Sequence, residues 1–141
     1  MTLKVKKLHP DAILPKYIRP QDAAMDLYSC EEVVIPFQQR VLVPTGIAMA
    51  IPLGFVGLIW DRSGIAANYG IKSMGGVIDS SYRGEIKVIL HNLTAQPFKI
   101  EKGMRIAQML IQEVQQHEIK EVEWLDETVR GKEGFGSSGM K

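Results

Sequence analysis

Hydrophobic residues in this chain occur in short runs that are separated by prolines and glycines. The main runs occupy residues 31–36, 40–52, 54–60, 84–93, 98–103 and 105–114. Most of them are rich in valine and isoleucine, which strands favour, and prolines lie at their edges, where a missing backbone N–H is tolerated. Many short strands between regularly spaced turn signals predict an all-β sandwich or barrel.

Three stretches depart from this strand pattern. Residues 63–70 (SGIAANYG) are the one candidate for a helix, which would be barely two turns long. Residues 117–125 (HEIKEVEWL) fit a strand or a helix, because their periodicity does not decide between the two. Residues 130–141 contain four glycines, two serines and no strand pattern, which predicts a flexible tail.

Composition narrows the classes of protein to consider. The 141 residues suit a single domain, and 45% hydrophobic with 23% charged residues supply one core. The formal net charge of +1 gives no basic field for a duplex, so we expect no nucleic-acid partner. Cys30 is the only cysteine, which excludes an internal disulfide and favours a reducing compartment. Without a secretory signal pattern or a long apolar stretch, we expect a cytoplasmic protein with no membrane contact.

An unusual set of side chains lies in the strand–turn–strand unit of residues 75–88 (GGVIDSSYRGEIKV). A turn needs only small or polar residues, yet this one carries Asp79, Tyr82 and Arg83. A carboxylate beside glycines can accept a proton from a water molecule that is hydrogen-bonded to it. The alternative is that Asp79 caps the turn, Tyr82 is a half-buried strand residue and Arg83 is a surface group.

A candidate phosphate site follows the predicted strand at residues 54–60. Arg62 supplies a planar donor fork, Ser63 a hydroxyl group and Gly64 a backbone N–H that a ligand can approach closely. Because these residues begin the predicted helical turn, free N–H groups would add to the site. Ser63 is alternatively a simple helix N-cap.

Further candidates lie outside these two segments. Asp26 lies between apolar residues at the expected start of a strand, where its carboxylate would either serve Mg²⁺ through water or be structural. Gln108 interrupts an apolar run and is either satisfied within the core or reaches a ligand. The tail places Arg130 and Phe135 among glycines and serines that would wrap a polyphosphate once ordered, although it does not fit the G-x-x-x-x-G-K-[ST] phosphate loop.

Taken together, these segments resemble the trimeric dUTPase family, the deoxyuridine triphosphate nucleotidohydrolases. The family has five ordered motifs, and similar stretches occur here in the same order between residues 23 and 139. They are AAMDLYS (23–29), DRSGIA (61–66), GGVIDSSYRGEI (75–86), KGMRIAQMLI (102–111) and RGKEGFGSSG (130–139). A single motif of this kind is weak evidence, whereas five in order are specific.

The chain departs from the family pattern at four positions. Ala24 stands where the first motif usually has glycine, and Met25 where it has an aromatic residue or leucine. Asp61 replaces the proline that normally precedes the arginine of the second motif, which adds a negative charge beside the phosphate site. Ser73 stands where some members have an asparagine that touches uracil.

The resemblance implies a jelly-roll-like β-barrel or sandwich that assembles as a homotrimer with shared active sites. It implies a barrel domain over residues 1–127 and a flexible glycine-rich lid over residues 128–141. The substrate would be dUTP, hydrolysed with Mg²⁺ to dUMP and pyrophosphate, which keeps uracil out of DNA and supplies dUMP for thymidylate synthesis. One subunit would supply the phosphate site, a second the hairpin and a third the tail.

The resemblance also implies roles for individual residues. Asp79 would be the general base that activates water for attack on the α-phosphate, and Asp26 would hold the metal through its waters. Tyr82 would lie against the deoxyribose, Arg83 would pair across a subunit contact, and Phe135 would stack on the uracil ring. The implied substrate-binding residues are Arg62, Ser63, Gly64, Ser73, Gly76, Val77, Ile78, Tyr82, Lys87, Gln108, Arg130, Phe135, Gly136 and Ser137.

Backbone groups of the hairpin would recognise the base. Those around Gly76, Ile78 and Lys87 would pair with the uracil edge, and Gly75 with Gly76 would permit close approach because glycine lacks a Cβ atom. Cytosine would place its amino donor against a backbone donor, which costs roughly 1–3 kcal/mol.

Two alternatives remain at this level. A dCTP deaminase-like enzyme of the same superfamily needs a glutamate near the pyrimidine amino group, whereas this chain has Asp79 in a V-I-D-x-x-Y-R-G context. A non-catalytic dUTP-binding regulatory module on the same scaffold would bind dUTP without turning it over. Generic phosphatase chemistry is disfavoured, since His9, His91 and His117 lie far apart in sequence and suggest no metal cluster.

Overall fold

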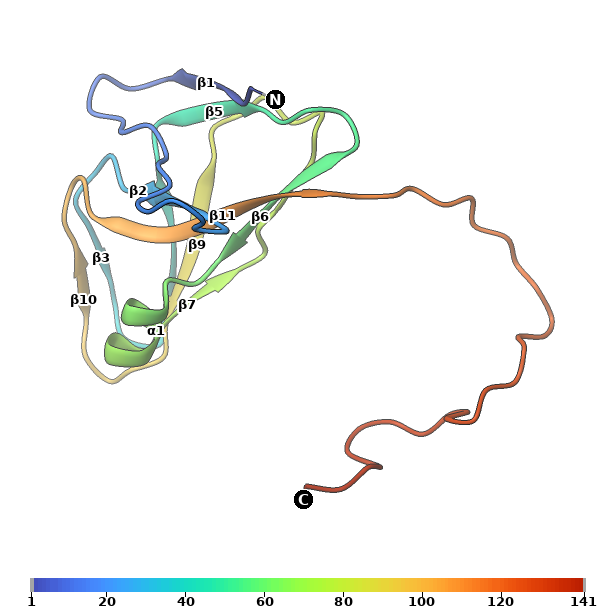
Figure 1. The fold of residues 1–141 in the computed structure, drawn as a ribbon. Helices are drawn as coiled ribbons and strands as arrows, with labels where there is room; N and C mark the ends of the chain where they lie inside the picture. The colour runs from blue at the N-terminus through green and yellow to red at the C-terminus, as the bar shows by residue number, and fades with distance from the viewer. Residues whose placement is uncertain (1, 141) are drawn as a thin grey trace.

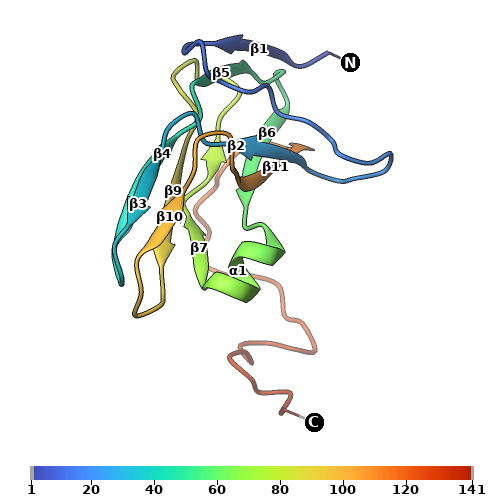
Figure 2. The ribbon, with the colours of Figure 1, turned by 90° about the vertical axis from the view of Figure 1, so that its left-hand side faces the viewer.

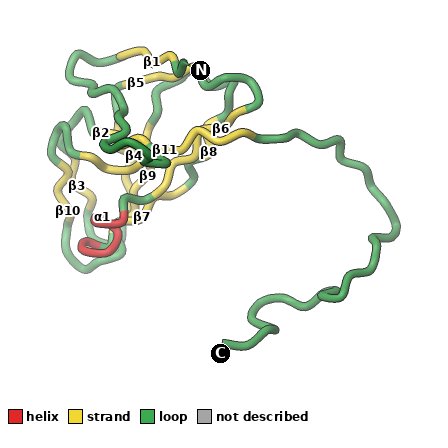
Figure 3. Tube along the Cα trace, viewed as in Figure 1, coloured by secondary structure: helices red, strands yellow, loops and turns green. Residues whose placement is uncertain are grey.

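The computed structural model describes residues 2–140, which form eleven β-strands and one short helix (Figure 3). The strands are β1 (Lys4–Lys7), β2 (Met25–Tyr28), β3 (Val33–Ile35), β4 (Arg40–Pro44), β5 (Ile47–Ala50), β6 (Phe55–Trp60), β7 (Ile71–Met74), β8 (Val77–Ile78), β9 (Lys87–Asn92), β10 (Phe98–Ile100) and β11 (Arg105–Glu113). The helix α1 (Ser63–Tyr69) lies within the stretch that the sequence marks as helical. The predicted all-β fold class is confirmed.

The strands pair in an antiparallel manner and form two larger sheets and two strand pairs. One sheet has the order β2-β11-β6-β8 and the other the order β4-β9-β7, while β1 pairs with β5 and β3 with β10. Figures 1 and 2 show these sheets folded around one interior, with α1 beside β7. This arrangement places β2 and β6 on either side of β11, so segments far apart in sequence meet along one strand.

Aliphatic side chains from both larger sheets fill the interior. Leu27 on β2, Met109 on β11 and Val43 on β4 are all fully buried. Burial of such a side chain contributes about 1.5–3 kcal/mol. Ile86, which lies just before β9, is also fully buried, so the turn that carries Asp79 is anchored to the same core.

Helix α1 begins without a side-chain cap. Arg62 precedes the helix with an extended backbone, and no side chain accepts a hydrogen bond from the first turn, so Ser63 is not the N-cap. Gly70 ends the helix in the left-handed conformation, with φ of 60°, and its N–H donates to the carbonyl oxygen of Ala66. The hydroxyl group of Ser63 is therefore not used to cap the helix.

Two strands are not evident from the apolar runs. β1 has the sequence KVKK, and only Val5 packs against the core while the backbone pairs with β5. β7 has the sequence IKSM and is half polar, but it pairs with β9 over its whole length and buries Ile71 and Ser73. Both segments are therefore strands because they pair with strands far away in the sequence. No helix among residues 2–140 is long and apolar enough to cross a membrane.

The C-terminal segment runs away from the packed body. β11 ends at Glu113, and residues 114–140 form neither strand nor helix, including the ambiguous stretch 117–125. Figures 1 and 3 show the segment curving away from the sheets. The last strand of the described chain therefore ends at Glu113, and the boundary at residue 127 between the barrel domain and the lid stays a prediction.

Candidate active site

Two cavities contain most of the predicted site residues. The first, of about 870 Å³, is lined by the predicted residues Asp26, Arg62, Ser63, Gly64 and Gln108. The second, of about 270 Å³, is lined by the predicted residues Val77, Ile78, Asp79, Tyr82 and Lys87. The two linings share no residue among those that the structure describes. One chain therefore brings the predicted residues of the first cavity together as one group, which we call the phosphate-type group. The predicted hairpin residues form a second group in a separate cavity.

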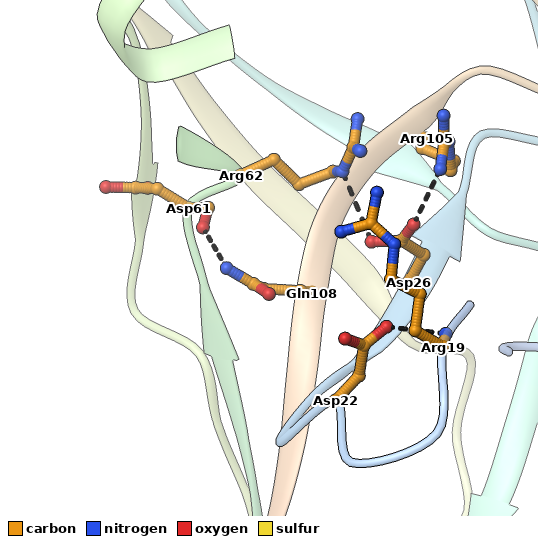
Figure 4. Close-up of polar contacts among 7 residues, drawn as sticks. All are labelled: Arg19, Asp22, Asp26, Asp61, Arg62, Arg105 and Gln108. Carbon is orange, nitrogen blue, oxygen red and sulfur yellow. Dashed lines mark hydrogen bonds and ion pairs between the residues drawn. The ribbon is translucent and has the colours of Figure 1, made fainter. Parts of the chain in front are cut away.

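A carboxylate held by two arginines lines the first cavity. Arg62 donates from Nε to Oδ1 of Asp26 at 3.2 Å, and Arg105 donates from Nη1 to Oδ2 at 3.3 Å (Figure 4). Asp26 is only 8% exposed, so its charge needs these partners. The arrangement fixes the direction of both guanidinium groups, since each donates one N–H to the same fixed carboxylate and retains other donors for a ligand.

Strand register brings these groups together. Gln108 on β11 lies opposite Asp26 on β2 and, on its other side, opposite Trp60 at the end of β6. Arg62 lies two residues after the end of β6, and its side chain reaches Asp26 on β2. The side-chain amide of Gln108 donates from Nε2 to the carbonyl oxygen of Asp61 at 2.7 Å. The amide that interrupts an apolar run thus holds the loop that precedes Arg62.

The unusual acid at position 61 is compensated within the chain. Its carboxylate accepts a hydrogen bond from Lys72 Nζ at 2.8 Å and another from the backbone N–H of Ser73. Burial by itself would raise the pKa of Asp61, but the hydrogen bonds from Lys72 and Ser73 outweigh it and hold the pKa below its ordinary value. Figure 4 shows this carboxylate pointing away from Asp26 and Arg62, so its charge does not face the phosphate-type group.

The first cavity does not fit a metal ion held directly by the protein. Both oxygens of Asp26 already accept a bond from an arginine, and no cluster of three His, Cys, Asp or Glu residues within 2–140 is arranged to hold a metal. Each carboxylate oxygen still has a free lone pair. Asp26 therefore fits a metal ion that is bound by another ligand and that Asp26 contacts only through the metal's water molecules. This is the role that the sequence predicts for Asp26.

The second cavity is lined by β8, the turn after it and β9, together with Leu42 of β4. The Asp79 side chain is exposed on the cavity wall, and the Asp79 carbonyl oxygen accepts the N–H of Tyr82 at 3.1 Å. The hydroxyl group of Tyr82 donates to the Glu85 carbonyl oxygen at 2.9 Å. Arg83 donates from Nη1 to the carbonyl oxygens of Ser80 and Tyr82, at 2.6 and 2.8 Å. Within this chain Arg83 therefore closes its own turn, and its pairing across a subunit contact stays a prediction.

Two predicted hairpin residues do not line the second cavity. Ser73 is buried on β7, and its backbone N–H is bound by Asp61. Gly76 has φ of 103°, and a Cβ atom there would lie 2.9 Å from the carbonyl oxygen of Ile59 on β6. The contact with β6 by itself therefore requires glycine at position 76, and the close approach of a base there stays a prediction.

The predicted tail residues contact neither cavity in the isolated chain. Arg130 donates from Nε to the carbonyl oxygen of Glu133 within the tail, and Phe135 is fully exposed. Gly136 and Ser137 belong to the same exposed segment. A site that uses these residues therefore requires movement of the tail or a second chain.

Sequence reasoning missed several lining residues. In the first cavity these are Arg19, Asp22, Trp60 and Arg105, and in the second they are Leu42 and Glu85. Arg105 lies within the fourth motif and Glu85 within the third, and these two positions are the available signals. The others come from segments whose neighbours are decided only by strand pairing.

Comparison with known proteins identifies the family. The family model that matches is described as dUTPase and covers residues 10–139. The deoxyuridine 5'-triphosphate nucleotidohydrolase of Mycolicibacterium gilvum is 49% identical over 98% of this chain and 95% of its own length. The protein of the same name from Syntrophotalea carbinolica is 46% identical over 99% of this chain and 98% of its own length.

Solved structures give the same result. A mutant dUTPase of Staphylococcus bacteriophage 80alpha with dUpNHpp matches with a TM-score of 0.93 and 31% identity over 99% of each chain. A mutant dUTPase of phage phi11 of S. aureus, described with a structural Mg(II) ion, matches with a TM-score of 0.83 and 28% identity over 88% of this chain and 98% of that chain. The ordered motifs, the all-β fold and these matches over nearly the full length together show that the chain belongs to the dUTPase family.

Proposed function

We propose that the protein hydrolyses dUTP to dUMP and pyrophosphate. The observation that carries this proposal is the second cavity, which Asp79 and Tyr82 line together with Ile78 and Lys87. This cavity has the residue types and size for a nucleoside beside a carboxylate. The names of the relatives support dUTP as the nucleotide.

The base and sugar would be read by the hairpin. Backbone groups at Ile78 and Lys87 pair with the edge of uracil, and a cytosine leaves a buried donor unpaired at a cost of roughly 1–3 kcal/mol. Tyr82 is held by its hydrogen bond to the Glu85 carbonyl oxygen. Its ring therefore stays against the deoxyribose and leaves no space for a 2′-hydroxyl group.

The phosphates would bind in the first cavity, the one that Asp26 and Arg62 line. Arg62 supplies a guanidinium fork that Asp26 orients, and Ser63 supplies a hydroxyl group that no helix cap uses. These donors stabilise charge on the phosphate oxygens and hold the α-phosphorus for in-line attack. Asp79 accepts the proton of the attacking water, which is worth about 10²–10⁴-fold in rate.

Mg²⁺ is proposed as the cofactor, with Asp26 as its contact through water. When bound, the ion would neutralise charge on the triphosphate oxygens. The support is the free lone pairs on the Asp26 oxygens and the structural Mg(II) ion described for the phi11 dUTPase.

A homotrimer with shared active sites is proposed as the working form. The support is that one chain holds the two cavities apart and leaves residues 114–140 unpacked. Ile119, Trp124 and Leu125 in this segment are 91%, 86% and 84% exposed, which is costly for apolar side chains unless a neighbouring chain covers them. The tail residues Arg130, Phe135, Gly136 and Ser137 would then close over a substrate bound between neighbours.

We also propose a cytoplasmic location. The support is Cys30, the only cysteine, which leaves the chain without an internal disulfide, as is usual in a reducing compartment. Cell fractionation with an antibody to the protein would test this location.

Release of pyrophosphate from dUTP, UTP, dCTP and dTTP in the presence of Mg²⁺ tests the proposed reaction. Strong preference for dUTP supports it. Release of ammonia from dCTP would instead favour a deaminase, and tight binding of dUTP without products would favour a regulatory module.

The pairing of Asp61 with Lys72 leads to a prediction about substrate affinity. Lys72→Met leaves the carboxylate of Asp61 uncompensated beside the phosphate cavity, so KM for dUTP should rise about two- to fivefold with little change in kcat. The double variant Asp61→Asn with Lys72→Met should return KM to the wild-type value, because the introduced side-chain amide is neutral yet still accepts the N–H of Ser73. Steady-state kinetics at low salt measure both values.

A remote ion pair provides the control for this prediction. The Nζ atom of Lys99 lies 3.2 Å from Oε1 of Glu32, with both side chains more than half exposed. Lys99→Met removes the same charge and should leave KM unchanged. A double variant that stays as impaired as Lys72→Met would contradict the charge argument.

A further inference from the structure

Arg19 is the arginine of the first cavity whose charge has no carboxylate partner among the described residues. Three arginines line the cavity, namely Arg19, Arg62 and Arg105. The last two each donate to Asp26, whereas no ion pair involves the Arg19 guanidinium in the part of the chain that the structure describes. Figure 4 shows this guanidinium directed to the same space as those of Arg62 and Arg105. All its donors are thus available to an incoming anion.

The backbone around Arg19 is fixed, so the side chain starts from a defined position. Asp22 accepts the N–H of Arg19 on Oδ2 at 2.8 Å, and its own N–H donates to the Arg19 carbonyl oxygen at 3.2 Å. Gln21 between them has φ of 77°, which few residues other than glycine adopt. The N–H of Asp26 donates to the Lys16 carbonyl oxygen at 2.8 Å, which ties both ends of this loop to β2.

The charges around the cavity favour an anion. The lining carries three arginines and three aspartates, and Lys72, the partner of Asp61, brings the formal charge of these side chains together to +1 (four minus three). Asp61 also lines the cavity, but Lys72 neutralises its charge and its carboxylate points away. Arginine binds phosphate oxygens through two parallel N–H groups, so a fork without a carboxylate partner is the group best suited to a further phosphate.

We propose that Arg19 is a further phosphate-binding residue that contacts the phosphates absent from dUMP, namely the distal phosphates of dUTP and the pyrophosphate product. This inference rests on the proposed hydrolysis of dUTP and adds a phosphate contact outside the five motifs. The α-phosphate has to lie beside Asp79, which belongs to the other cavity. Arg62 and Ser63, which follow β6, face it from the phosphate cavity, and Arg19 extends that cavity toward the loop before β2.

The test compares Arg19→Gln with the full-length wild type by titration calorimetry and kinetics. We expect Arg19→Gln to weaken pyrophosphate binding and to raise KM for dUTP by about tenfold each, as for one lost charge-assisted contact. The value of kcat should stay within about twofold and the Kd for dUMP should not change. Arg19→Lys should recover part of the loss, because it keeps the charge but not the fork.

Arg40→Gln is the matched control, since Arg40 is exposed at the start of β4 and lines neither cavity. It should leave all four values unchanged. Unaltered pyrophosphate affinity in Arg19→Gln overturns the proposal, and so does an equal loss of dUMP and pyrophosphate affinity, which indicates a disturbed loop. A wild type that binds pyrophosphate but never hydrolyses dUTP would contradict the proposed function alone, since the pyrophosphate titration still tests Arg19.

Discussion

Asp79→Asn is expected to lower kcat for dUTP hydrolysis by about 10²–10⁴-fold and to leave the affinity for dUTP within about threefold. Asparagine has the shape of aspartate but cannot accept the proton of the attacking water. The Asp79 side chain is exposed and makes no hydrogen bond or ion pair with the residues that the structure describes, so its replacement breaks no structural contact. Turnover of dUTP and titration with a non-hydrolysable analogue measure the two effects separately.

Asp11→Asn serves as the control for this variant. Asp11 is an exposed aspartate that pairs with Lys102 at 2.8 Å and lines neither cavity. It should retain wild-type kcat and KM. Near-normal turnover by Asp79→Asn would remove Asp79 as the general base, even if the family assignment stands.

Removal of residues 130–141 is expected to leave a folded protein whose kcat/KM for dUTP falls on the order of 10²-fold or more. The buried core ends with β11, and no side chain of the described tail residues 130–140 belongs to it, so the melting temperature should change little. The loss combines one aromatic stacking contact, worth about 1–3 kcal/mol, with one charge-assisted contact from Arg130. Kinetics, thermal unfolding and the elution volume on size exclusion give the three readouts.

Phe135→Ala in the full-length chain separates stacking from the other tail contacts. Phe135 is fully exposed in the isolated chain, so its truncation cannot damage the core. It should raise KM by about tenfold, while Val129→Ala, at an equally exposed position before the tail motif, should have no effect. A truncated protein with the full wild-type rate would show that the tail does not close over the substrate.

The local pattern of hydrophobic and polar residues was sufficient to predict most of the strands and the helix. Runs of apolar residues became β3, β6, β9 and β11, because each of these segments buries large aliphatic side chains in the core. The small residues of SGIAANYG became α1, which ends at Gly70. The same pattern failed for β1, which has one apolar residue among lysines and is a strand only because β5 pairs with it.

The sequence by itself determined the family, through residue types at ordered positions, and it determined where most strands lie. Only the tertiary structure decided which side chains of the site contact one another. Asp26 and Arg105 are 79 residues apart, and only the pairing of β2 with β11 makes them neighbours. The neutralisation of Asp61 by Lys72 and the packing of Gly76 on Ile59 likewise depend on segments that meet only in the folded chain. The physical reason is that side-chain contacts between strands depend on register, which the whole core fixes and no local stretch encodes.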